Sequence, residues 1–176
     1  MKKVIAALML VALTASVSAT LVNAADNMAF KGTLRAHACT LHPDDRAIQI
    51  DFLDLGTHSL YLYGGTADQR FDIRLLNCNV NVASDVQVTF QGTPNNTIPG
   101  ALALDASSQA AGFAIVLKDA AKQQLNLGDM SSSPIVGADT TLEFYRRVQV
   151  EPDALVNRGI VPGVFTASAT FELFYP

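Results

Sequence analysis

Apolar and polar residues alternate with a period of two along most of this chain, a pattern typical of strands that bury one face. Amphipathic helical periodicity is hard to find beyond the N-terminal segment. The pattern predicts strands at residues 28–39, 47–52, 71–76, 86–90, 113–117, 142–150 and 165–175. Turn-rich segments separate them, including residues 91–96 and 129–134. The number and spacing of these strands predict an all-β, antiparallel sandwich of immunoglobulin-like size.

The last predicted strand carries an apolar face to the end of the chain. The residues on that face are Phe165, Ala167, Ala169, Phe171, Leu173 and Tyr175. Polar residues take the other face, which only Phe174 interrupts. A sandwich that ends here has no following strand for its last hydrogen-bonding edge, unless the N-terminus supplies one. An open edge beside an apolar face favours the addition of a strand.

Residues 1–24 have the layout of a cleavable export signal. Lys2 and Lys3 precede an apolar run at residues 4–17, and small residues lead to Ala24. The run is short for a membrane span, which needs about 20 residues. We expect the mature chain to begin at Ala25, with Ala19 as the alternative cleavage point.

The net charge argues against nucleic acid as a partner. Removal of the signal leaves 10 basic and 16 acidic residues, a formal charge of −6 on 152 residues. The apolar content of 49% and the charged content of 16% exclude a disordered chain. The length suits one domain with a single core.

Cys39 and Cys78 are the two cysteines, and in an exported chain they predict an intramolecular disulfide. Closing a loop of roughly 40 residues stabilises the fold by about 3 to 4 kcal/mol. The alternative is a metal cluster made by His37, Cys39 and His42.

Catalytic constellations are missing from the sequence. The three histidines, His37, His42 and His58, all lie in its first third, and no nucleophile elbow, phosphate loop or metalloprotease motif is present. We therefore predict a protein that is not an enzyme, with no cofactor and no small-molecule substrate. Asp44-Asp45 is interpreted as a solvated turn, with binding of a cation as the alternative. Arg146-Arg147 is interpreted as a solvated face, with contact to an acidic partner as the alternative.

Residues 25–38 form a segment with its own apolar face before the first cysteine. Met28, Phe30, Gly32 and Leu34 alternate with polar or small residues. Two interpretations stay open at this point. The segment packs into its own sandwich, or it is a detachable arm that fills the groove of a neighbour.

The arm at residues 27–34, the cysteine contexts Ala38-Cys39 and Leu75-Leu-Asn-Cys78, and the ending at residues 161–176 together resemble pilins of the chaperone-usher family. The resemblance is closest to minor adaptor subunits of P-pilus-type tip fibres. Gly163, fourteenth from the C-terminus, and the penultimate Tyr175 match two marks of the family. Pro176 departs from it, because proline has no backbone N–H to pair.

The resemblance implies an incomplete immunoglobulin-like sandwich that lacks its last strand and is completed in trans by donor-strand complementation. The implied divisions are a signal at 1–24, a donor-strand extension at 25–38 and a pilin domain at 39–176. Its partners would be a periplasmic chaperone, an outer-membrane usher and neighbouring subunits, on the way to a surface pilus that supports cell adhesion. A self-contained sugar-binding module is the alternative.

The resemblance also assigns the site residues. The donated strand is assigned to Met28, Phe30, Gly32 and Leu34. The acceptor groove and chaperone contact are assigned to Gly163, Phe171, Leu173, Tyr175 and Pro176. Gly163 is expected to set the turn into the last strand.

Overall fold

The computed structural model describes residue 31, residues 38–52 and residues 55–176. The chain divides into two units, Met1–Leu34 and Arg35–Pro176, and every described helix and strand belongs to the second. The predicted signal and the proposed donor residues Met28, Phe30, Gly32 and Leu34 lie outside the described residues. Among the described helices, none has the length and apolar character needed to cross a membrane.

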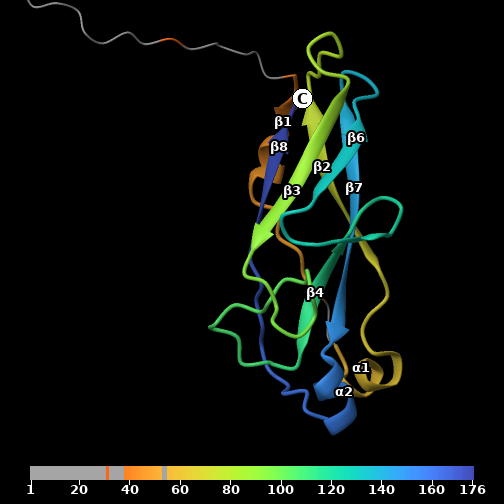
Figure 1. The fold of residues 1–176 in the computed structure, drawn as a ribbon, viewed down its shortest axis with the longest axis vertical. Helices are drawn as coiled ribbons and strands as arrows, with labels where there is room; N and C mark the ends of the chain where they lie inside the picture. Colours follow the sequence, from red (N-terminus) through yellow and green to blue (C-terminus); the bar gives the residue numbers. More distant parts are fainter. Residues whose placement is uncertain (1–30, 32–37, 53–54) are drawn as a thin grey trace, which may run out of the picture. The chain divides into compact units, whose positions relative to one another are not determined.

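Two antiparallel sheets build the second unit (Figure 1). One sheet has the order β1-β2-β7-β4-β5 and the other β6-β3-β8. The first sheet comprises β1 (Thr40–Leu41), β2 (Gln69–Leu76), β7 (Thr140–Val150), β4 (Phe113–Lys118) and β5 (Gln124–Leu125). The second comprises β6 (Met130–Pro134), β3 (Asp85–Gly92) and β8 (Ala169–Phe174). This arrangement is the predicted immunoglobulin-like sandwich, and β2, β3, β4 and β7 confirm four of the predicted strands.

The core lies between the inner faces of the two sheets. Phe144 of β7 is 1% exposed, and its ring centroid lies 5.7 Å from that of Phe71 and 5.0 Å from that of Phe90. Inward-facing residues on β2 and β3 are also fully buried, namely Ile73, Leu75, Val86 and Val88. Burial of such side chains contributes about 1.5 to 3 kcal/mol each, which explains why the alternating segments form the sandwich.

Three of the structural predictions made from the sequence are wrong. Residues 47–52 pair with no strand among the described residues, and the ladder of the last strand begins at Ala169 rather than Phe165. Residues 130–134, predicted as a turn, form β6 and pair with β3, where Ser132 lies opposite Gln87. Pairing with a neighbouring strand satisfies the backbone of this serine-rich segment, which its local composition does not reveal.

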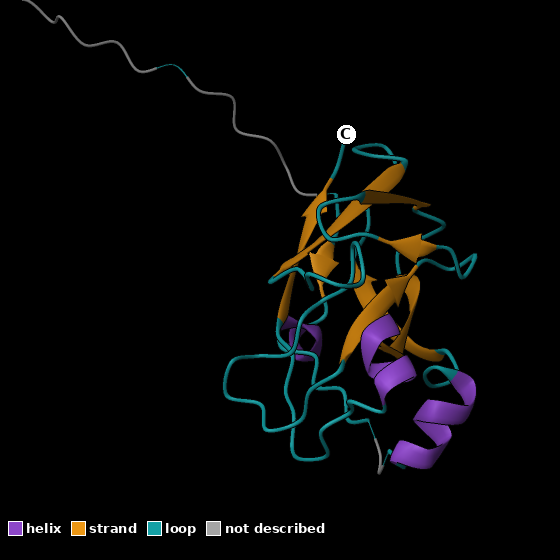
Figure 2. Ribbon diagram, turned by 60° about the horizontal axis from the view of Figure 1, so that its bottom comes forward, coloured by secondary structure: helices purple, strands orange, loops and turns teal. Residues whose placement is uncertain are grey.

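Short helices connect the strands (Figure 2). A 3-10 helix, η1, spans Pro43–Arg46, and the α-helices are α1 (Thr57–Tyr63) and α2 (Pro152–Asn157). Both α-helices lie at the same end of the sheets in Figure 1, and β8 leads to the chain end at the opposite end. Helices of 7 and 6 residues are too short to show a helical period in the sequence.

Candidate functional site: a groove beside the last strand

Strand β8 has one paired and one open edge among the described residues. It pairs with β3 on one side, and no described strand pairs with its other side. Phe171 and Leu173 face the core, whereas Glu172 and Phe174 point outward, and Phe174 is 59% exposed. The predicted alternation is therefore confirmed. However, Phe171 and Leu173 are only half-buried, as expected for a face that no strand of the described residues covers.

A groove with a volume of about 620 Å³ adjoins this strand. Two extended segments contribute to its lining: residues 163–167 with Ala169 and Phe171, and Ile48, Ile50, Asp51, Phe52 and Leu55. The rings of Phe52 and Phe165 approach to 6.0 Å between these segments. The sheets contribute Phe71, Phe90, Leu102, Ile115, Leu117 and Arg146. The lining is therefore apolar except for a few side chains, which suits an extended apolar segment.

Gly163 lies at a bend six residues before β8 and packs against a neighbouring loop. A Cβ atom at this position would lie 2.8 Å from Gln109 Cβ and 3.1 Å from the Ala110 nitrogen. The backbone N–H of Gln109 donates to the Val164 carbonyl at 2.9 Å. Gly163 thus allows the chain to approach this loop closely, rather than forming the turn that leads directly into the last strand.

The structure separates the assigned groove residues into two sets. Gly163 and Phe171 line the groove, while Leu173 and Tyr175 continue the same half-buried face beyond it. Burial raises the pKa of the Tyr175 phenol above its usual value. Pro176 is exposed at the end of the chain. These positions leave the chain end accessible to a partner.

Arg146 lines the groove, although its place in an arginine pair predicted a solvated face. It lies on the inner face of β7, in the same alternating row as Phe144 and Val148. Its guanidinium carbon lies 5.1 Å from the centroid of the Phe52 ring, and its Nη1 donates to the Arg70 carbonyl at 3.1 Å. The alternation along β7 could have predicted this position, because residue 146 lies in the same every-second-residue series as the buried residues of the strand.

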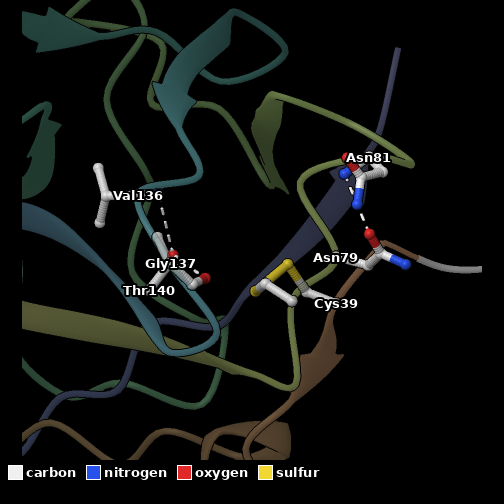
Figure 3. The surroundings of a disulfide bond; sticks show 7 residues. Cys39, Asn79, Asn81, Val136, Gly137 and Thr140 are labelled. Atoms are coloured by element: carbon white, nitrogen blue, oxygen red, sulfur yellow. Dashed lines mark hydrogen bonds between the residues drawn. A yellow bond between two sulfur atoms is a disulfide. The ribbon is translucent and has the colours of Figure 1, made fainter.

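The disulfide between Cys39 and Cys78 is formed, as predicted (Figure 3). It joins the segment before β1 to the segment after β2, and the Asn79 N–H donates to the Ala38 carbonyl at 2.7 Å beside it. Because Cys39 is oxidised, the alternative metal cluster with His37 and His42 is wrong; His37 itself lies outside the described residues.

Asp45 corrects the prediction of a solvated turn. Asp44 is exposed, but Asp45 is only 4% exposed and its carboxylate accepts from the Arg74 backbone N–H at 2.6 Å and from Arg74 Nη2 at 2.5 Å. The Arg74 guanidinium holds the pKa of this carboxyl below its ordinary value. The helix η1 therefore places a carboxylate against β2, beside the point where the His42 N–H donates to the Arg74 carbonyl.

The described residues thus form an immunoglobulin-like sandwich in which an apolar groove lies beside the last strand, and no described strand pairs with the second edge of that strand. The model of the family described as Fimbrial protein matches residues 28–176. The chain therefore belongs to this family of pilus subunits, whose members are structural proteins.

Comparison with individual proteins gives the same family. The chain is 28% identical to the putative minor fimbrial subunit PmfF of Proteus mirabilis, over 84% of this chain and 83% of PmfF. It is 29% identical to the fimbrial adapter PapK of Escherichia coli, over 86% of this chain and 88% of PapK. The crystal structure of the P pilus rod subunit PapA has the same fold, with a TM-score of 0.67 and 23% identity over 80% of this chain and 100% of that one.

Proposed function

We propose that this protein is a minor, adaptor-type subunit of a chaperone-usher pilus, exported after loss of residues 1–24 and assembled by exchange of strands. The observation that carries the proposal is the groove beside the open edge of β8. A periplasmic chaperone first fills this groove, and at the outer-membrane usher the arm of the next subunit replaces it. The protein in turn donates residues 25–38 to another neighbour and so helps to build a surface fibre that supports adhesion.

Backbone pairing and apolar burial favour insertion of a strand into the groove. An inserted strand gains a backbone ladder along β8 and covers the half-buried Phe171. Burying three or four apolar side chains, such as Met28, Phe30 and Leu34 of an arm like this one, contributes about 1.5 to 3 kcal/mol each. Gly32 would suit the narrowest part of a groove, where a side chain has no room. Similarity to PapK, which is named a fimbrial adapter, supports the adaptor role.

The test is thermal unfolding of the full chain, purified after export, with and without a synthetic peptide of residues 25–38. We expect the peptide to raise the melting temperature by several degrees, because it binds only the folded state. A matched peptide in which Phe30→Ser removes one apolar side chain without adding a charge should have a much smaller effect. A stable monomer that is unaffected by these peptides and by the arm peptide of a related subunit would refute strand acceptance and support the self-contained sugar-binding module instead.

A further inference from the structure

Arg146 is an unusual residue for the inner face of a β-sandwich. The other members of its row on β7, Leu142, Phe144, Val148 and Val150, are each at most 4% exposed. Arg146 lines the groove in the middle of this row. Transfer of a guanidinium from water to such a site is unfavourable unless a partner compensates.

The described residues provide only part of that compensation. Arg146 donates from Nη1 to a backbone carbonyl, but its buried Nε has no hydrogen-bond partner among them. No described carboxylate lies within ion-pair distance, although Asp51 lines the same groove. Burial lowers the pKa of the Arg146 guanidinium, but arginine keeps its charge at neutral pH. The groove therefore contains a cation with unused donors.

Strand register places this cation near the middle of the groove. Phe144 lies opposite Phe71, whose ring contacts Phe90, and Phe90 lies opposite Phe171 of β8. At the other end of the row, Val150 lies opposite Phe113 of β4.

The ring of Phe113 contacts that of Phe165. Along the groove, Arg146 therefore lies between Phe171 and Phe165. The central part of a strand inserted along β8 would pass next to Arg146.

We infer that Arg146 selects the strand that this subunit accepts, by pairing with an aspartate or glutamate at a central, inward-facing position of a neighbouring subunit's arm. This inference rests on the proposed strand exchange. Arginine offers several donors in a planar fork that matches a carboxylate, and a hydrogen bond between charged groups in a partly buried site is stronger than one in water. The remaining apolar lining supplies affinity, and the cation supplies discrimination.

The chain's own arm does not meet this requirement. Its central apolar-face residues are Met28, Phe30, Gly32 and Leu34, and the acidic residue of the same parity, Asp26, stands at the end of the arm. Moving Asp26 to the centre would shift the strand by about four residues, or roughly 13 Å, and leave half of the groove unfilled. The groove should therefore prefer another subunit's arm to that of a second copy of this chain.

The test uses the full exported chain and peptides of residues 25–38. Each of Met28, Phe30 and Leu34 is replaced in turn by Glu and, in a matched twin, by Gln, and the affinities are measured by competition against the labelled parent peptide. At one position we expect the Glu peptide to bind about tenfold or more tightly than its Gln twin.

Protein variants assign this preference to Arg146. The variant Arg146→Leu should lose it while still binding the parent peptide, and Arg146→Lys should retain part of it. Arg147→Leu, on the opposite face of β7, is the matched control and should leave it unchanged.

Three outcomes would overturn the inference. If the parent peptide binds but Glu and Gln twins bind equally at every position, selection by Arg146 is wrong and strand acceptance stands. If no peptide binds, both are wrong. If a Glu preference appears only after Asp51→Asn, the chain itself supplies the carboxylate for Arg146, and the partner does not.

Discussion

Loss of the Asp45 carboxylate should destabilise the sandwich, because this carboxylate binds the backbone and side chain of Arg74 on β2. The Asp45 side chain accepts the Arg74 backbone N–H at 2.6 Å and also bonds the guanidinium of the same residue. A hydrogen bond to a charged group contributes about 1.5 to 3 kcal/mol. The Arg74 side chain is 44% exposed, so solvent screens the ion-pair part, and we discount it. The expected cost of Asp45→Asn is therefore about 1 to 2 kcal/mol.

The pH dependence gives a second test of the same pair. The folded-state pKa of Asp45 is lowered, so its contribution is complete above the unfolded pKa of about 3.9 and is lost as the pH falls through the lower folded value. The difference in unfolding free energy between the wild type and Asp45→Asn should thus be constant near neutral pH and shrink below about pH 4.

Urea unfolding of the oxidised protein at several pH values measures both effects. Asp44→Asn is the matched control, because the Asp44 side chain is 77% exposed, and it should change the free energy of unfolding by less than about 0.5 kcal/mol. Equal effects of the two substitutions, or a difference that does not change with pH, would refute the role assigned to Asp45.

Two further perturbations test the groove wall and the disulfide. Replacement of Cys39 and Cys78 by serine should lower the free energy of unfolding by about 3 to 4 kcal/mol, and reduction of the wild type should reproduce the loss in melting temperature. Gly163→Val should cost about 1 to 3 kcal/mol, because its side chain would meet Gln109, whereas Gly137→Ala, with open space around it, should be nearly neutral in the same melting experiment. Equal melting temperatures for the two glycine variants would contradict the close packing.

The fold class was predictable because its main signal is local. Alternation of apolar residues along β2, β3 and β7 follows from the two-residue repeat of a strand, and each segment carries it independently of its partners. β4 was predictable from its uninterrupted apolar run. The apolar face of the last strand was predictable for the same reason. The disulfide followed from the presence of only two cysteines in a chain whose N-terminus predicts an export signal.

Which strands pair, and which polar side chains are buried, depended on the tertiary structure. The serine-rich segment of β6 has a turn-like composition, and it becomes a strand only because β3 offers it a hydrogen-bonding edge. Asp45 is buried because Arg74, 29 residues away, supplies the partner that a carboxylate needs.

Arg146 occupies a position of β7 that faces the core in the alternating pattern, but its charge predicted a solvent-exposed side chain. Its place in the groove is decided by the meeting of β7 with the segments of Phe52 and Phe165, which lie far from it in the sequence. The sequence by itself thus determined which segments become strands and which face of each is apolar, since both follow from neighbouring residues. The tertiary structure decided which strand edge no other described strand pairs with and which charge lies beside it, because both depend on contacts between distant parts of the chain.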